Sequence, residues 1–186
     1  MATKNITALK KAADAGDAEA QYVLGSKYYF GEGVSRDAKK AFHWFEQAAM
    51  REHAEAQSSL GSCYLVGMGT RKNKKLGLRW LNISVENGST QGMRNLAMAY
   101  EQGDVVEQDV EEAARLLNMA AQNGDREAAK RLKTLCDEYD LEIQVKSKRS
   151  RRTKTSRSEF SELAALQAAA RAQGIQTSPL SIRIVK

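Results

Sequence analysis

The chain has 186 residues, of which 42% are hydrophobic, and a formal net charge of +6. No apolar run approaches the roughly 18 residues that span a membrane, and residues 1–7 lack the apolar core of a signal peptide, so we expect a cytoplasmic protein. The only cysteines, Cys63 and Cys136, fall within helical pattern and predict free thiols, not a disulfide framework.

Apolar residues recur at helical spacing through the first three quarters of the chain and predict an all-α fold. Asp17, Asp37 and Ser89 are suited to cap helix N-termini, and Gly31 is placed to end a helix. Eight helices are expected, over residues 4–14, 18–30, 38–50, 54–66 and 74–86, two within 89–124, and one over 125–139. Gly77 makes the fifth helix irregular, because alanine is the better helix former.

The helices repeat with a period of 36 residues. Leu24 returns as Leu60 and Leu96, and Trp44 returns as Trp80. A sustained period of this length is the signature of a solenoid, in which helices of ~13 residues depend on the neighbouring repeat for stability. The equivalence of the two tryptophans predicts a structural role for both, with Trp44→Ala costing ~3–5 kcal/mol.

The positive charge is concentrated in the C-terminal part of the chain. Residues 1–143 hold 19 Lys+Arg and 21 Asp+Glu, a net of −2, whereas residues 144–186 hold 10 and 2, a net of +8. This split predicts a repeat domain over 1–143 and a mostly disordered basic tail over 144–186. A short helix is expected within the tail, near residues 158–173.

One repeat carries a recognisable pattern. The segment 18–49, AEAQYVLGSKYYFGEGVSRDAKKAFHWFEQAA, contains a Gly-x-Gly-Val bend, an Asp-x-x-Lys-Ala motif and a Trp followed by Ala-Ala. It resembles the Sel-one-like repeat, a relative of the tetratricopeptide repeat, and the resemblance extends over about residues 5–140. It implies a right-handed α-solenoid of antiparallel helix pairs and an adaptor for other proteins, not an enzyme. Many bacterial members are secreted or periplasmic, and some carry one disulfide per repeat; we expect this chain to fall outside that branch, since it shows neither a leader pattern nor paired cysteines.

Positions that the repeat leaves variable on each first helix are candidates for binding. They fall at i, i+3, i+7 and i+10 and therefore share a helix face, and stacked repeats would join them into a concave surface. The candidates are Glu19, Tyr22, Ser26, Tyr29, Glu55, Ser58, Ser62, Leu65, Gln91, Arg94, Met98 and Glu101. We expect this surface to hold a peptide or helix of another protein. The alternative for Tyr22 and Tyr29 is packing against the neighbouring repeat.

The residues give little support to catalysis. His43 and His53 are the only histidines, and neither has a metal-ligand spacing to Cys63 or to carboxylates. His53 occupies a helix-start position that Asp17 also occupies, which predicts a capping or surface role. No nucleophile has a matched base and orienting acid. We therefore expect no enzyme activity, no metal and no cofactor.

The basic tail offers a second interaction site. Its cations within residues 146–157 are Lys146, Lys148, Arg149, Arg151, Arg152, Lys154 and Arg157. Such a run binds nucleic acid phosphates without sequence preference, or an acidic protein or anionic membrane, or serves only as a linker. The runner-up function is accordingly a nucleic-acid-associated adaptor. In a third interpretation, residues 158–186 occupy the protein's own groove and autoinhibit it.

Overall fold

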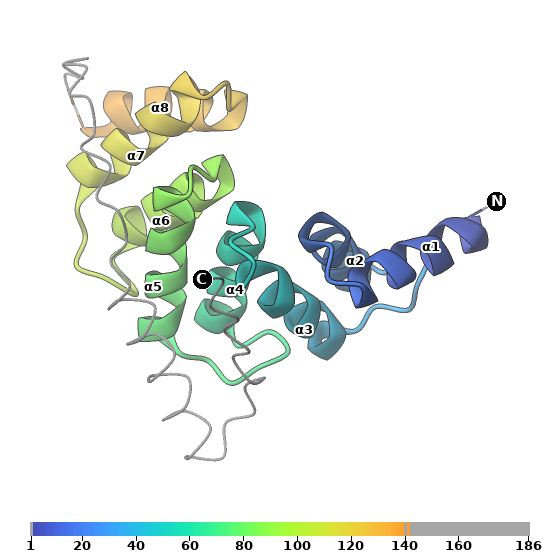
Figure 1. Ribbon diagram of the computed structural model, residues 1–186. Coiled ribbons are helices and arrows are strands. Elements are labelled where there is room, and N and C mark those ends of the chain that lie inside the picture. The colour runs from blue at the N-terminus through green and yellow to red at the C-terminus, as the bar shows by residue number, and fades with distance from the viewer. Residues whose placement is uncertain (1, 140, 142–186) are drawn as a thin grey trace, which may run out of the picture.

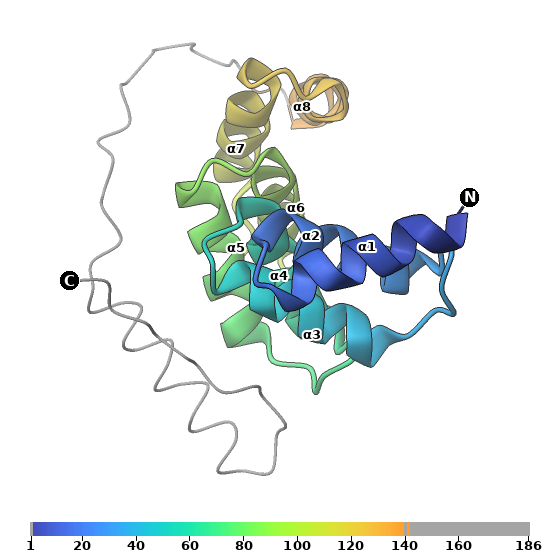
Figure 2. The same ribbon diagram turned by 45° about the vertical axis from the view of Figure 1, so that its right-hand side comes forward.

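The computed structural model describes residues 2–139 and 141, with side chains from residue 6 onward, and within them it contains eight α-helices and no strand. The helices are α1 (Ala2–Asp14), α2 (Ala18–Phe30), α3 (Ala38–Ala49), α4 (Ala54–Val66), α5 (Lys74–Glu86), α6 (Thr90–Gln102), α7 (Val110–Gln122) and α8 (Arg126–Tyr139). They follow one another along a curved array (Figure 1, Figure 2). The predicted all-α solenoid is confirmed. None of the described helices has the length and apolar character needed to cross a membrane.

Local capping explains why the predicted helix bounds agree closely with the structure. Asp17 accepts a hydrogen bond of 2.8 Å from the backbone N–H of Ala20 at the start of α2. Nδ1 of His53 accepts one of 3.2 Å from Ala56 at the start of α4. Gly31 ends α2 in the left-handed region, with φ of 80°, where glycine has no steric cost. The capping role predicted for His53 is confirmed.

The two helices of a repeat pack closely through glycines. A Cβ on Gly61 of α4 would lie 3.0 Å from the carbonyl oxygen of Gly77 of α5 and 2.9 Å from Leu81. A Cβ on Gly77 would overlap Leu65. Residue 61 therefore faces residues 77 and 81 while residue 65 faces residue 77, so the helices are antiparallel. The expectation that alanine would suit position 77 better was wrong, because close helix approach outweighs helix propensity there.

Successive repeats are joined by a buried glutamine on each of the first two repeats. Nε2 of Gln21 donates to the carbonyl oxygen of Ala13 at 3.0 Å, and Nε2 of Gln57 donates to that of Ala49 at 3.3 Å. Both glutamines are buried. Each one gives a second hydrogen bond to a carbonyl near the C-terminal end of the preceding helix, since Ala13 and Ala49 also accept from the backbone N–H groups of Gly16 and Glu52.

A loop also connects neighbouring repeats. The segment between α4 and α5 passes beside the start of α3 (Figure 1). A Cβ on Gly69 would overlap the carbonyl oxygen of Ala38, whereas one on the equivalent Gly33 would come no closer than 3.6 Å to Ile6. The second loop therefore rests on the preceding repeat, and the first loop is more open.

The core consists of two hydrophobic clusters that meet at α5. Trp80 belongs to the cluster formed with α1 to α4, and the adjacent Leu81 belongs to the cluster formed with α6 to α8. Trp80 is fully buried, whereas the equivalent Trp44 packs against the first cluster but stays partly exposed. The structural role predicted for Trp44 fits this packing, while its partial exposure lowers the cost that we now expect for Trp44→Ala. The tail cations of residues 146–157 and the helix expected at 158–173 lie outside the described residues.

Candidate partner-binding groove

A groove of about 410 Å³ opens between the first helices of the repeats, α2, α4 and α6. It carries no charged side chain among those that line it. The lining residues are Tyr22, Ser26, Tyr29, Phe30, Phe45, Ser59, Ser62, Cys63, Val66, Met68, Gln91 and Asn95. Aromatic and aliphatic side chains combined with a few polar groups are the usual composition of a binding pocket.

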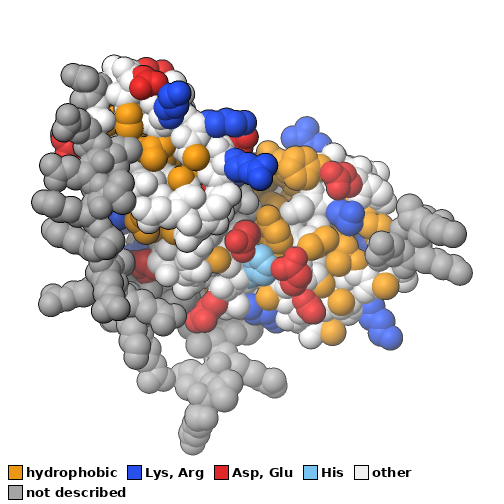
Figure 3. Space-filling model, turned by 90° about the horizontal axis from the view of Figure 1, so that it is seen from above, with side chains coloured by type: hydrophobic (Ala, Val, Ile, Leu, Met, Phe, Trp, Pro, Cys, Tyr) orange, Lys and Arg blue, Asp and Glu red, His pale blue; other side chains and the backbone are white. Residues whose placement is uncertain are grey.

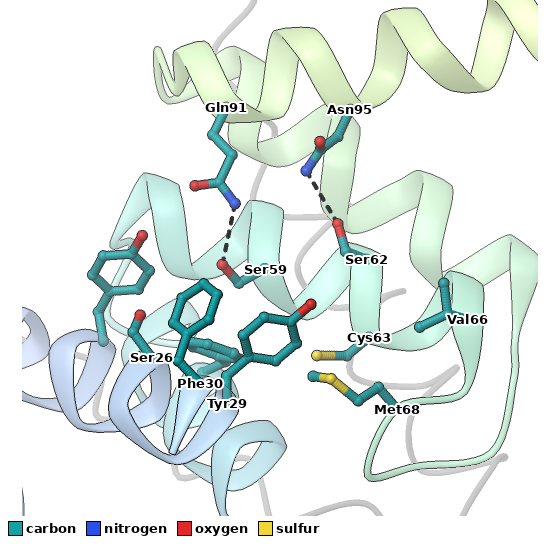
Figure 4. A pocket seen from close by; sticks show the side chains of 12 residues that line it. Ser26, Tyr29, Phe30, Ser59, Ser62, Cys63, Val66, Met68, Gln91 and Asn95 are labelled. Atoms are coloured by element: carbon teal, nitrogen blue, oxygen red, sulfur yellow. Dashed lines mark hydrogen bonds between the residues drawn. The ribbon is translucent and has the colours of Figure 1, made fainter. Parts of the chain in front are cut away.

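On one side of the groove, hydrogen bonds join α6 to α4. Nδ2 of Asn95 donates to the hydroxyls of Ser58 and Ser62 at 3.0 and 3.1 Å. Nε2 of Gln91 donates to the hydroxyl of Ser59 at 3.4 Å (Figure 4). These bonds hold α6 directly against α4, whereas α2 and α4 approach each other much less closely. The groove therefore opens between α2 and α4.

The mouth of the groove exposes large hydrophobic side chains. Tyr29 and Phe30 lie edge to face with ring centroids 4.7 Å apart, and Figure 4 shows Tyr29 beside Cys63 and Met68. Phe30 is 66% exposed and Val66 is 71% exposed. Their positions are equivalent in the two repeats, so the exposed apolar rim is itself repeated.

The structure brings part of the predicted surface together in this groove. Tyr22, Ser26, Tyr29, Ser62 and Gln91 line it. Their role in binding stays a prediction, but their shared location follows from the helical spacing on which that prediction was based.

The other predicted residues lie elsewhere or contact neighbouring repeats. Ser58 is fully buried, Leu65 packs against the second cluster, and Met98 is 50% exposed outside the groove. Arg94 forms an ion pair with Asp125 at 3.1 Å, and Glu101 pairs with Arg131. These two ion pairs connect α6 to α8 and to Asp125, the residue just before α8. Arg94 and Glu101 therefore contact the first helix of the following repeat.

Glu19 and Glu55 flank His53 at the start of α4. Nε2 of His53 lies 2.9 Å from Glu19, and because Nδ1 accepts from the backbone, Nε2 is the nitrogen that donates. Glu55 lies 3.6 Å from the ring on the other side. Figure 3 shows acidic side chains around a histidine, next to hydrophobic side chains. The two glutamates form an acidic border outside the groove.

Tyr22 combines the two roles that were considered for it. Its ring stacks on His53 at 4.7 Å and lies 6.0 Å from Phe45, while the side chain also lines the groove. Burial raises the pKa of the Tyr22 hydroxyl, an effect that a hydrogen bond from Ser26 partly offsets. Tyr22 is therefore both a packing residue of the repeat interface and part of the groove wall.

Cys63 lines the groove but is not an activated nucleophile. Only 1% of the residue is exposed, and burial raises the pKa of its thiol to about 12. A thiol protonated at neutral pH is a poor nucleophile and a poor metal ligand. Cys63 therefore contributes shape and apolar surface to the groove floor.

Sequence reasoning did not assign the other lining residues to a binding surface: Phe30, Phe45, Ser59, Cys63, Val66, Met68 and Asn95. Phe30 and Val66 are the last residues of α2 and α4 and lie one position beyond the face that was selected. Their recurrence as large apolar residues 36 positions apart was the available signal. Met68 reaches the groove from a loop, which helical periodicity does not describe.

Comparison with known proteins identifies the architecture. The family model for the Sel1 repeat matches residues 18–53, 54–89 and 90–125, more than half of the chain. The array of paired helices is thus an α-solenoid of the Sel1 type, and the chain belongs to the Sel1 repeat family. The predicted resemblance is confirmed. Sel1 repeat proteins are generally non-enzymatic scaffolds for protein interaction.

Solved structures agree with this assignment. A protective antigen of uropathogenic Escherichia coli strains, described as displaying an SLR fold, is 30% identical with a TM-score of 0.66; the match covers 74% of this chain and 30% of that one. A Sel1 repeat protein from Oxalobacter formigenes is 35% identical with a TM-score of 0.58, covering 69% of this chain and 52% of the other. The chain therefore spans about a third to a half of these relatives. The comparison with curated proteins found no match.

Proposed function

We propose that this chain is a scaffold that holds a peptide or helix of another protein in the groove between α2, α4 and α6. The observation that carries this proposal is the pair of exposed side chains, Phe30 and Val66, at the mouth of an uncharged groove of about 410 Å³. Exposed apolar groups next to a concavity mark interaction sites on monomeric proteins. The general role of Sel1 repeats as interaction scaffolds supports it.

The groove offers a partner both anchoring surface and hydrogen bonds. Tyr29 and Phe30 provide rigid aromatic rings of the kind enriched at interface centres. Ser26 and Ser62 place hydroxyls on facing helices. A bound segment would set apolar side chains between α2 and α4 and direct polar groups to these hydroxyls. The absence of charged lining residues favours an apolar anchor in the partner.

A pull-down with mass spectrometry tests the proposal. The bait is the wild-type chain, the double variant Phe30→Ser/Val66→Ser, or a control variant, Tyr139→Ser, since Tyr139 is also exposed, at 48%, but lies outside the groove. Substitutions at such exposed sites should change stability by only about 0.5 kcal/mol. Loss of a partner's anchors should weaken binding by about 2 kcal/mol or more.

The control decides how the result is interpreted. Partners retained by the wild type and by Tyr139→Ser but lost by the double variant would support the groove. Equal retention by all three proteins would place binding elsewhere. Tyr22→Ala is a poorer probe, because Tyr22 also packs on His53 and its removal changes both stability and groove shape.

A further inference from the structure

Five exposed cations lie together where the first two repeats turn from one helix to the next. Arg36 and Lys39 surround the start of α3, and Arg71, Lys72 and Lys75 surround the start of α5. We call these five residues the basic edge. Arg36 and Lys72 are equivalent in the repeat, as are Lys39 and Lys75, so the charge pattern recurs in both units.

The loops bring the two halves of the basic edge side by side. Gly69, in the loop that carries Arg71 and Lys72, packs on the backbone of Ala38, next to Lys39. The second loop thus rests on the helix start from which the first group of cations projects. The two groups of cations are therefore carried by segments that touch at Gly69 and Ala38.

Folding does not account for these charges. Within the part of the chain that the structure describes, none of the five is paired with a carboxylate. The positive end of the helix dipole disfavours lysine in the first turn, yet Lys39 and Lys75 occupy first turns without an acidic residue. The equivalent turn of α7 carries Glu111 and Glu112, the favoured arrangement.

Two neighbouring lysines, Lys40 and Lys74, differ from these five cations because each has a partner within the fold. Lys40 lies 3.3 Å from Asp37 and over the ring of Tyr28, and Lys74 donates to the carbonyl of Asp104 at 2.5 Å. Both have partners within the fold. The five cations of the basic edge project to solvent instead, where they create a local positive potential.

The shape and composition of the basic edge indicate an extended polyanion. The cations lie on two loops and two helix starts, an open surface spread over two repeats, which suits a chain of regularly spaced phosphates. Within the described residues the two loops themselves expose no large hydrophobic side chain, although Phe30 and Val66 end α2 and α4 directly before them; lipid vesicles are therefore included in the test below. The sequence after residue 143 adds a net of +8 to the same chain.

We propose that the basic edge binds the phosphate backbone of a nucleic acid, so that the repeats themselves contact RNA or DNA through residues that do not line the protein-binding groove. The binding is electrostatic and has no base specificity, because the five side chains offer only cationic donors.

Fluorescence anisotropy with a labelled 20-nucleotide RNA tests this with the full chain. The edge variant is Arg71→Glu/Lys72→Glu/Lys75→Glu. The control variant, Lys10→Glu/Lys11→Glu/Lys133→Glu, makes the same change in net charge at exposed lysines of α1 and α8. Circular dichroism and thermal melting check that both variants are folded; all six substituted side chains are exposed, and glutamate at position 75 lies in the first turn of α5, where the helix dipole favours it.

The edge variant should bind RNA at least about tenfold more weakly than the control, and the slope of log Kobs against log salt should become shallower by about 2 to 3. The same affinity for both variants would overturn the proposal and assign any binding to net charge or to the tail. Equally tight binding of poly-glutamate or of phosphatidylserine vesicles, with the same dependence on the basic edge, would overturn it in favour of an acidic protein or a membrane.

Discussion

At the scale of single residues, one repeat position joins neighbouring units by different chemistry in each repeat. Tyr22 stacks on His53, the N-cap of the following repeat. Two repeats later, Arg94 occupies the same position and pairs with Asp125, whose carboxylate caps α8. The position thus serves the interface between units first and the concave surface second. This explains why helical periodicity alone also selected a residue such as Arg94, which does not line the groove.

The two tryptophans provide a matched test of burial. Trp80 is fully buried between the helices of the first cluster, whereas Trp44 is partly exposed. Trp80→Ala should lower the free energy of unfolding by about 3–5 kcal/mol. Trp44→Ala should cost at least about 1 kcal/mol less, because part of its ring already contacts water. Urea denaturation of both variants measures the difference, and equal costs would contradict the assignment.

The buried thiol of Cys63 predicts a specific pH dependence. Burial raises its pKa to about 12, above the value near 9 expected in the unfolded chain. Its contribution to stability is therefore complete below pH 9 and is lost as the pH rises toward 12. Over that range the wild type should lose stability faster than Cys63→Ala, by about 1.4 kcal/mol per pH unit.

Denaturation at pH 8 and at pH 10.5 measures this effect for Cys63→Ala and for Cys136→Ala. The pKa of Cys136 is also raised by burial and by Asp137, but this thiol is only half-buried and should show a smaller change. Identical pH dependence for the wild type and Cys63→Ala would show that the thiol is not held away from water.

At the scale of helices and loops, contacts between repeats make equivalent glycines unequal. Gly33 and Gly69 both have positive φ, 73° and 69°. Gly33→Ala should cost about 1 kcal/mol for the left-handed backbone alone. Gly69→Ala should cost about 1–3 kcal/mol more, because its Cβ would overlap Ala38. Thermal unfolding of the two variants tests this, and similar melting temperatures would mean that the loop does not rest on α3.

The sequence predicted the helices well because their ends depend on local chemistry. Asp17 and His53 accept backbone hydrogen bonds within three residues of themselves, so the residue types alone placed the helix starts. The close approach at Gly77 and the partial exposure of Trp44 depend on other repeats, which helix propensity does not describe. Phe30, at the rim of the groove, is the last residue of α2. It follows directly after Tyr29, the last position of the helix face that was predicted to bind, and was therefore not selected.

At the scale of the whole molecule, the array combines two features that use different residues of the same two repeats. An uncharged groove with an apolar rim opens between α2 and α4, and the basic edge lies at the loops of the same two repeats. Because α5 contributes to both hydrophobic clusters, the two halves of the solenoid form a connected support for these surfaces. The exposed rim residues of the groove, Phe30 and Val66, and the five cations of the basic edge are the members of these surfaces that project to solvent.

The most direct test of the central claim is site-specific photocrosslinking of the full chain in the cells that produce it. Benzoylphenylalanine would replace Phe30 or Val66 at the groove rim, and Tyr139 as the exposed control outside it. We predict that positions 30 and 66 capture the same protein and that position 139 does not. Capture of that protein equally from position 139, or no protein captured from either rim position, would contradict the claim that the groove binds a partner.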